Sequence, residues 1–257
     1  MKKFWIPFLI LSITIFVFCS TFDIYSTKIS RDISKDIESI PILKTELRIN
    51  LGRDLVIGPV EIEGIGLVKY PYVVSLNHTS SFNLDKVLYR FGIIKWEGKK
   101  EAIYTYTLIY EDEKVDLKFL ESKGDLVLFK IKGTKDIKNC PFKFADSSKF
   151  RVGTNVYILD RPYHVYRGFK TGIISCLKDI EDGSIFDSNK PMAIDSNVNP
   201  GDSGSIMLVY NMCKMRYEVA GILCAKYCYF NREMLSVYAD GMGYMITINH
   251  IKSLLEE

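Results

Sequence analysis

The sequence predicts an all-β fold, built as barrels or as a sandwich. From about Gly52 onward, short runs with strand character follow one another, separated by turn residues such as Lys123-Gly124 and Asp182-Gly183. Tyr and Phe number 16 and 15 in the 257 residues, and both side chains favour strands over helices. Many short strands at this spacing are typical of barrels and sandwiches, and they argue against a parallel α/β sheet.

The predicted strands are followed by one predicted helix. The strands cover, in chain order, residues 65–69, 72–76, 102–110, 115–120, 126–131, 155–159, 172–176, 192–195, 205–210, 218–224 and 243–248. The helix covers residues 249–257, where Asn249 is a good N-cap and Ile251, Leu254 and Leu255 supply the apolar positions. We therefore expect a β-rich domain that ends in a short helix.

The first residues predict export from the cytoplasm. Lys2 and Lys3 precede residues 4–19, a run without any charged side chain. Such a run is short for a membrane-spanning helix, and it also fits the hydrophobic region of a secretory signal. We expect a signal peptide or an N-terminal membrane anchor over 1–22, a polar stalk over 23–50, and one folded domain over 51–257. The domain is then membrane-anchored or secreted, and the membrane is a predicted partner through the N-terminal segment.

Composition argues for a packed domain and against nucleic-acid binding. The 34 Lys and Arg residues nearly balance the 31 Asp and Glu residues, which gives a net charge of +3. Phosphate binding needs a concentrated basic face, and this balance gives no sign of one. Hydrophobic residues make up 47% of the chain and charged residues 25%, which is typical of a globular core.

The cysteines do not define a disulfide pattern or a metal site. Five of the six follow the apolar run, so at least one thiol is unpaired within a monomer. A disulfide from Cys213 to Cys224 or Cys228 and a set of free buried thiols are both open interpretations. The spacing of Cys224 and Cys228 has no matching Cys/His pair nearby, so we expect no metal and no other cofactor.

The strongest local motif is Asn199-Pro-Gly-Asp-Ser-Gly204. Gly201 and Gly204 permit a tight bend. A bend of this kind can present the Ser203 hydroxyl outward and turn consecutive backbone N–H groups toward a developing oxyanion. An ordinary turn between two strands is the alternative interpretation of the same residues.

A serine nucleophile needs a base, and the chain has three histidines. His78 ends an apolar strand, which can hold the ring rigidly, so it is the preferred base. His164 and His250 are expected to be solvated or structural. The carboxylate that orients the imidazole is expected to be Asp125, which opens an apolar strand, with Asp116 as its rival.

The order His78, Asp125, Ser203 resembles the catalytic residues of chymotrypsin-like serine peptidases. The segments Val73-Val-Ser-Leu-Asn-His78, Gly124-Asp-Leu-Val-Leu-Phe-Lys130 and Asn199-Pro-Gly-Asp-Ser-Gly204 resemble the three motifs of that family. Residues 243–249 and the final helix resemble the end of the bacterial Do-like (HtrA) branch. The resemblance covers roughly Gly52 to the C-terminus. It implies two antiparallel six-stranded β-barrels with the site between them, and a peptidase domain without the PDZ domain of that branch.

The resemblance implies roles for further residues. The backbone N–H groups of Gly201 and Ser203 would form the oxyanion hole. Four positions would line the substrate pocket, namely Asn197, Cys224, Ala225 and Lys226. No acidic residue stands at the base of this pocket, so the resemblance does not support a preference for Lys or Arg side chains.

One residue of the nucleophile motif departs from the Do-like branch. Asp202 stands where that branch usually has asparagine, and zymogen-type relatives pair this aspartate with a new amino terminus made by cleavage. No convincing activation site is present in the sequence, so the partner of Asp202 is open. Because a buried, unpaired carboxylate is costly, we expect a nearby Lys, Arg or backbone donor to meet it.

The leading hypothesis is a serine endopeptidase that hydrolyses a protein or peptide substrate outside the cytoplasm through an acyl-enzyme. A catalytically inactive peptidase-fold binding module at the membrane is the alternative, and an esterase would use the same residues. Geometry separates the first two hypotheses: an active site needs His78 within hydrogen-bond reach of both Ser203 and Asp125.

Overall fold

The computed structural model describes residues 36, 38–52, 55–93, 95–96, 98–111, 113–133, 137–160, 168–177, 192–198, 202–231 and 236–256, with backbone alone for 160, 225–231 and 236–242. The chain divides into two compact units, 1–39 and 40–257, and the strands that the structure describes all lie in the second. The predicted signal peptide or anchor lies outside the described residues. In the part of the chain that is described, no helix is both long and apolar enough to cross a membrane.

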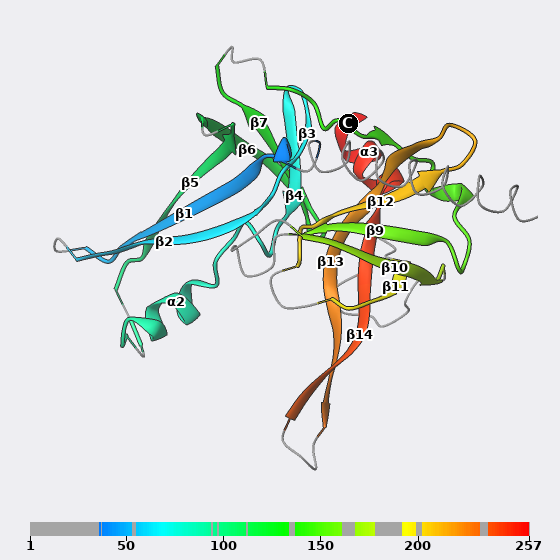
Figure 1. Cartoon of the computed structure of the whole chain (residues 1–257). Coiled ribbons are helices and arrows are strands. Elements are labelled where there is room, and N and C mark those ends of the chain that lie inside the picture. The colour runs from blue at the N-terminus through cyan, green and yellow to red at the C-terminus, as the bar shows by residue number, and fades with distance from the viewer. Residues whose placement is uncertain are drawn as a thin grey trace, which may run out of the picture. The chain divides into compact units, whose positions relative to one another are not determined.

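The first sheet is antiparallel and has seven strands in the order β2-β1-β5-β6-β7-β4-β3 (blue to green in Figure 1). Its strands are β1 (Ile42–Asn50), β2 (Val56–Ile65), β3 (Leu67–Lys69), β4 (Tyr72–Leu76), β5 (Glu101–Tyr110), β6 (Glu113–Lys123) and β7 (Leu126–Ile131). The helix α2 (Leu84–Arg90) follows β4, and the Asn83 side chain caps its first turn by accepting a hydrogen bond from Lys86 N–H at 3.0 Å. The predicted strands at 72–76 and 126–131 are confirmed to the residue.

The second sheet closes on itself. Its seven strands run in the order β12-β9-β10-β11-β14-β13-β8, and an additional β12–β13 pairing joins the first of them to the sixth. The strands are β8 (Lys143–Phe144), β9 (Asn155–Asp160), β10 (Gly168–Cys176), β11 (Met192–Ser196), β12 (Ile206–Asn211), β13 (Arg216–Asn231) and β14 (Ser236–Thr247), with a 3₁₀ turn η1 (Ser147–Lys149). The ring is thus a closed barrel of six antiparallel strands, because β8 pairs with β13 outside it.

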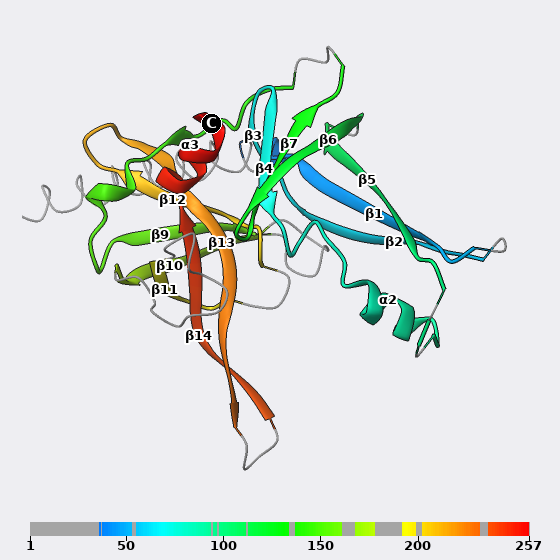
Figure 2. The same ribbon diagram turned by 180° about the vertical axis from the view of Figure 1, so that it is seen from behind.

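The barrel ends in the predicted helix. The helix α3 (Ile248–Glu256) buries Ile248, Ile251 and Leu254, and the Lys252 ammonium donates to the Ala145 carbonyl at 2.6 Å. At the other end of β14, β13 and β14 continue together beyond the other strands of their sheet (Figures 1 and 2). The all-β class, one six-stranded barrel and the short C-terminal helix are therefore confirmed.

The expectation of two closed barrels is wrong for the first sheet. Its edge strands are β2 and β3, which are consecutive in the chain and separated by Gly66 alone. One residue cannot turn the chain back, so these two edges cannot pair side by side. A Cβ on Gly66 would lie 2.9 Å from the Leu108 side chain and 3.0 Å from that of Val73. The chain therefore bends at Gly66, where it packs against the core. The sheet is open because its edge strands β2 and β3 are not hydrogen-bonded to each other.

The predicted stalk over 23–50 overlaps β1, which lies between β2 and β5 in the sheet. Buried residues alternate with more exposed ones along this strand, and the buried set includes Leu43, Leu47 and Ile49. The outward residues include Lys44, whose ammonium lies 2.8 Å from a Glu61 carboxylate oxygen on β2. These outward charges gave the segment its polar composition, which hid the alternation.

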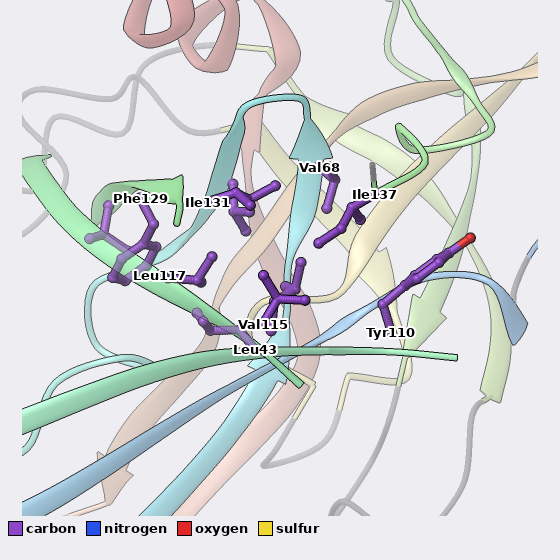
Figure 3. Close-up of a cluster of buried hydrophobic side chains, with 11 residues drawn as sticks. Leu43, Val68, Tyr110, Val115, Leu117, Phe129, Ile131 and Ile137 are labelled. Carbon is purple, nitrogen blue, oxygen red and sulfur yellow. The ribbon is translucent and has the colours of Figure 1, made fainter. Parts of the chain in front are cut away.

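A cluster of buried apolar side chains forms the core on the first sheet and is drawn in Figure 3. Phe129 of β7 is fully buried there, and Val73 of β4 and Leu108 of β5 belong to the same cluster. Burial of each such side chain contributes about 1.5–3 kcal/mol to folding. This packing fixes β4 against β7, and the ends of those two strands carry the candidate site.

Candidate active site

The register of β4 and β7 brings His78 to Asp125. Leu76, the last residue of β4, pairs with Leu126, the first residue of β7. The residues just beyond therefore face each other, and Asn77 N–H donates to the Asp125 carbonyl at 2.6 Å. The His78 backbone N–H donates to Asp125 Oδ1 at 3.0 Å, and its ring Nδ1 lies 2.6 Å from Oδ2.

This arrangement sets the tautomer of His78. An ionised carboxylate only accepts hydrogen bonds, so the ring Nδ1 carries a proton and donates it to Asp125. In the neutral ring, Nε2 is then left with a lone pair that can accept a proton. The His78 side chain is 44% exposed and that of Asp125 is 14% exposed, so the ring is accessible while the carboxylate behind it is largely covered.

Hydroxyl groups hold the turn that carries His78. The Thr79 and Ser80 hydroxyls donate to the Leu76 carbonyl at 3.1 and 2.6 Å, and the Ser81 hydroxyl donates to the Asn77 carbonyl at 2.7 Å. These bonds satisfy carbonyl groups at the end of β4 that no longer have a strand partner. The turn is therefore tied back to the end of β4.

Ser203 lies in a tight bend at the start of β12. Ser205 N–H donates to the Asp202 carbonyl at 3.0 Å, which closes the turn, and Gly204 N–H donates to the Leu223 carbonyl of β13 at 2.7 Å. Gly204 has φ of +93°, a conformation that a type II turn requires at its third position and that glycine adopts without strain. Asp202, Gly204 and Ser205 are buried, whereas Ser203 is partly exposed.

Asp202 is buried beside Ser203, with 0% of its side chain exposed. The Lys170 ammonium group on β10 lies 2.6 Å from Asp202 Oδ2 and donates to it. A carboxylate removed from water needs a charged or hydrogen-bonding partner. Lys170 therefore meets the expectation of a nearby Lys, Arg or backbone donor.

The bend with Ser203 lies against the turn with His78. A Cβ added to Gly204 would be 3.7 Å from Thr79 Oγ1 and 3.8 Å from the Ile65 nitrogen, so only the space of one side-chain carbon separates the backbone next to Ser203 from the residue next to His78. In the part of the chain that the structure describes, no hydrogen bond joins the Ser203 hydroxyl to the His78 ring. The structure thus brings His78 and Asp125 into direct contact and places Ser203 on an adjacent turn.

Cys224 of the second sheet lies close enough to Asp125 of the first sheet to be affected by its charge. Burial raises the pKa of the Cys224 thiol well above its ordinary value, and the negative charge of Asp125 raises it further. Cys224 of β13 is 1% exposed, and its thiol donates to the Tyr244 carbonyl at 3.2 Å. Cys224 is therefore a neutral thiol held inside the barrel, within electrostatic range of Asp125.

The other residues predicted for the site divide into two groups. Asn197 is exposed after β11, and Cys224 is buried as described. Gly201 and the side chains of Ala225 and Lys226 lie outside the described residues. The oxyanion-hole and substrate-pocket assignments therefore stay predictions.

The rival residues have other surroundings. Asp116 is exposed on β6, and its backbone carbonyl accepts a hydrogen bond from Lys132 N–H. The His250 ring lies 2.9 Å from the Thr247 hydroxyl at the start of α3, a local contact, whereas His164 lies outside the described residues. Over the described ranges, no group of three His, Cys, Asp or Glu side chains is placed to hold a metal ion.

Sequence reasoning missed Lys170 as a residue of this site. In β10, buried or half-buried residues alternate with exposed ones, and Lys170 shares its face with Gly172 and Ile174, while Phe169 and Ile173 are exposed. A lysine on the inward face of a barrel strand signals a buried partner of opposite charge. That signal depends on the strand beginning at Gly168, before the predicted start at residue 172.

Comparison with solved structures finds a similar fold in an HtrA-type protease. A variant of the HtrA-type protease AlgW, solved with a tripeptide, matches with a TM-score of 0.56 and 15% sequence identity. The match covers 87% of this chain and 61% of the other, so this chain spans less than two thirds of that protein's length. No family model and no curated protein matches the sequence. The chain therefore shares the fold of that HtrA-type protease, which is a trypsin-like fold.

Proposed function

We propose that this protein is a serine endopeptidase in which His78, Asp125 and Ser203 form the catalytic triad. The observation that carries the proposal is the 2.6 Å contact of His78 Nδ1 with Asp125 Oδ2, which leaves Nε2 able to accept a proton. The half-exposed Ser203 on the adjacent turn and the peptidase-type fold also support it.

In this mechanism the Ser203 hydroxyl attacks a peptide carbonyl while its proton passes to His78 Nε2. The tetrahedral oxyanion is held by backbone N–H groups of the bend, to which we assign Gly201 and Ser203. His78 then gives its proton to the leaving amine, and water releases the acyl group from Ser203 by the reverse sequence. Asp125 stays ionised throughout and stabilises the imidazolium that forms.

The lack of a Ser203–His78 hydrogen bond is compatible with an active enzyme. Catalytic hydrogen bonds are often long without substrate and shorten in the substrate complex. The two turns are neighbours, because a single carbon added to Gly204 would already contact Thr79, and rotation of the Ser203 side chain changes its distance from the ring.

That same feature favours the second candidate function, an inactive peptidase-fold binding module. A serine hydroxyl without a base in contact is a poor nucleophile. We propose for either function that the domain lies outside the cytoplasm, tethered or exported by the N-terminal segment, and that its partner is a protein or peptide.

A serine-directed fluorophosphonate separates the two functions. We expect the purified chain to form a covalent adduct at Ser203, located by mass spectrometry, and the Ser203→Ala variant to form none. Ser253→Ala, which removes an exposed serine of α3, is the matched control and should label like the wild type. A folded wild-type chain that gives no adduct would favour the binding module.

Peptide and ester substrates then separate a peptidase from an esterase. Both reactions require the same acyl-enzyme, but an amide has the poorer leaving group and needs protonation by His78. We expect turnover of a peptide library that disappears in Ser203→Ala. Turnover of esters alone would assign the triad to an esterase.

A further inference from the structure

Asp202 is the most deeply buried charged group in the described part of the domain. Its side chain is 0% exposed, compared with 14% for Asp125 and 4% for Glu218. Asp202 directly precedes Ser203, and its own carbonyl accepts the Ser205 N–H bond that closes the bend. An interaction that fixes the position of the Asp202 side chain therefore also fixes the backbone conformation at Ser203.

Lys170 of the same barrel provides such an interaction, as an ion pair with Asp202. In the register of the strands, Lys170 of β10 pairs with Ile158 of β9, and Ile158 pairs with Met207 of β12. The lysine thus lies two strands from the start of β12, and its Nζ reaches Asp202 Oδ2 at 2.6 Å with 21% of the side chain exposed. The ion pair is an intrinsic part of the folded barrel because both residues belong to it.

We propose that Lys170 is a positioning residue that holds the Asp202–Ser205 bend ready for catalysis in the intact chain. Removal of Lys170 takes away the cation that lies 2.6 Å from Asp202 Oδ2, so the buried carboxylate is less well compensated and the bend that it belongs to is displaced. With Lys170 present, the bend needs no cation from a new amino terminus, and cleavage of the chain is not required for activity.

The effect on catalysis rests on the proposed serine peptidase function, whereas the effect on the bend does not. Two kinds of measurement therefore address the proposal. Fluorophosphonate labelling reports on the reactivity of Ser203. Amide hydrogen exchange reports on the order of the bend itself, through the Gly204 N–H bond to Leu223 and the Ser205 N–H bond to Asp202.

The labelling experiment compares the rate of adduct formation in the intact chain and in its variants. Lys170→Met should lower the rate by about 100-fold, because a buried carboxylate that has lost its ammonium partner disfavours the native bend. Lys170→Arg keeps the charge and should retain much of the rate. Intact-mass measurement should find the wild-type adduct on chains without internal cleavage. Adducts confined to cleaved chains would overturn the proposal.

Lys214→Met is the matched control. Lys214 also donates to a buried carboxylate of the second sheet, Glu218, at 3.1 Å, but Glu218 keeps bonds from Arg216 and Asn211. This variant removes an equivalent charge far along the β12–β13 hairpin, so its labelling rate should equal that of the wild type. Equal rates for Lys170→Met and Lys214→Met would contradict a positioning role for Lys170.

A double variant tests whether charge is the cause. Lys170→Met combined with Asp202→Asn removes both charges, and the neutral amide can still accept and donate hydrogen bonds. We expect it to recover most of the labelling rate that Lys170→Met loses. If Lys170→Met fails to fold, the folding of the double variant tests the proposal instead. A double variant that also fails to fold would show that the defect does not come from the lost charge pairing, and it would contradict the proposal.

Hydrogen exchange completes the test. In Lys170→Met we expect the Gly204 and Ser205 amides to exchange faster, while Ile174 N–H, bonded to the Thr154 carbonyl in the same barrel, keeps its protection. Unchanged exchange at Gly204 and Ser205 would overturn the proposal even if the wild type never labels. If the wild type is not labelled, the proposed peptidase function is contradicted. The hydrogen-exchange comparison then still tests whether Lys170 holds the bend.

Discussion

The two halves of the domain hold their parts of the candidate site in different ways. In the first sheet, strand register alone places Asp125 opposite the turn with His78, and two hydrogen bonds to His78 follow from that placement. In the second sheet, the bend with Ser203 has its backbone bonds to β13 and also a buried ion pair that spans two strands.

This difference determines how each half responds to change. The His78–Asp125 pair is partly exposed, and the Asp125 carboxylate also accepts a bond from the His78 backbone N–H, so a change there alters the chemistry and leaves the fold intact. The Lys170–Asp202 pair is largely buried, so loss of one member leaves the other charge less well compensated at a place away from water, which destabilises the barrel. Chemistry and stability are therefore separable in the first half and coupled in the second.

The largest expected effect tests the chemistry of the first half. Asp125→Asn should keep the fold, but it allows the ring to present the wrong tautomer to Ser203, and the labelling rate should fall by about 10⁴-fold. Urea unfolding should give nearly the wild-type midpoint. Asp116→Asn, at the exposed rival position, should change neither measurement, and a comparable loss in both variants would contradict the assignment of Asp125.

A change in the packing of the first half should reduce stability. Leu47 of β1 is 0% exposed. Leu47→Ala should lower the unfolding free energy by about 2–5 kcal/mol, because it leaves a cavity in a packed core. Arg48→Ala, on the exposed face of the same strand, is the control. If both variants unfold like the wild type, β1 would be part of a stalk and the predicted domain start at residue 51 would be right.

A backbone change in the second half should lower reactivity to a smaller extent. Gly204→Ala places a side chain in a left-handed conformation, which costs about 1–2 kcal/mol. The Cβ itself meets no atom closer than 3.7 Å, so conformational strain and not a clash is the cause. We expect the Ser203 labelling rate to fall roughly tenfold, because relief of the strain shifts the bend.

Gly153→Ala is the matched control for that variant. Gly153 has φ of +87° in an exposed turn, with no atom within 4 Å of an added Cβ. It should therefore show a similar loss of stability in urea unfolding and no loss of labelling. Equal labelling losses in both variants would mean that Gly204 acts through global stability alone.

The smallest expected effect concerns the buried carboxylate remote from the site. Burial acts to raise the pKa of Glu218, but hydrogen bonds from Asn211, Arg216 and Lys214 outweigh it, and the pKa lies below its ordinary value. A lowered folded-state pKa stabilises the fold above the unfolded pKa of about 4.3, and this contribution is lost as pH falls through the folded value.

Urea unfolding at pH 6 and pH 3 measures that contribution. Wild type should lose more unfolding free energy than Glu218→Gln over this interval, because the glutamine does not titrate. Ser203 labelling at pH 7 should be unchanged by the substitution. Identical acid losses in the two proteins would show that Glu218 is not among the groups linked to acid unfolding.

Several features of the fold could be predicted because they depend on local pattern. The strands at 72–76 and 126–131 have strongly apolar runs bounded by turn residues, and the final helix has its N-cap and apolar face within a few residues. The segment 42–50 could not be recognised in the same way. Its outward charges are paired across the sheet with residues such as Glu61, and that pairing is not visible in the strand's own sequence.

The sequence by itself determined the residue types of the candidate site, the glycine that permits the bend at Ser203, and the alternation that makes the chain all-β. Tertiary structure alone decided that Lys170 is the cation at Asp202, that His78 meets Asp125 and not Asp116, and that the first sheet stays open at Gly66. The physical reason is the distance along the chain over which each kind of interaction acts. Turn and strand preferences act over a few residues, whereas an ion pair across 32 residues or a contact across 47 exists only after strand register has set the distances.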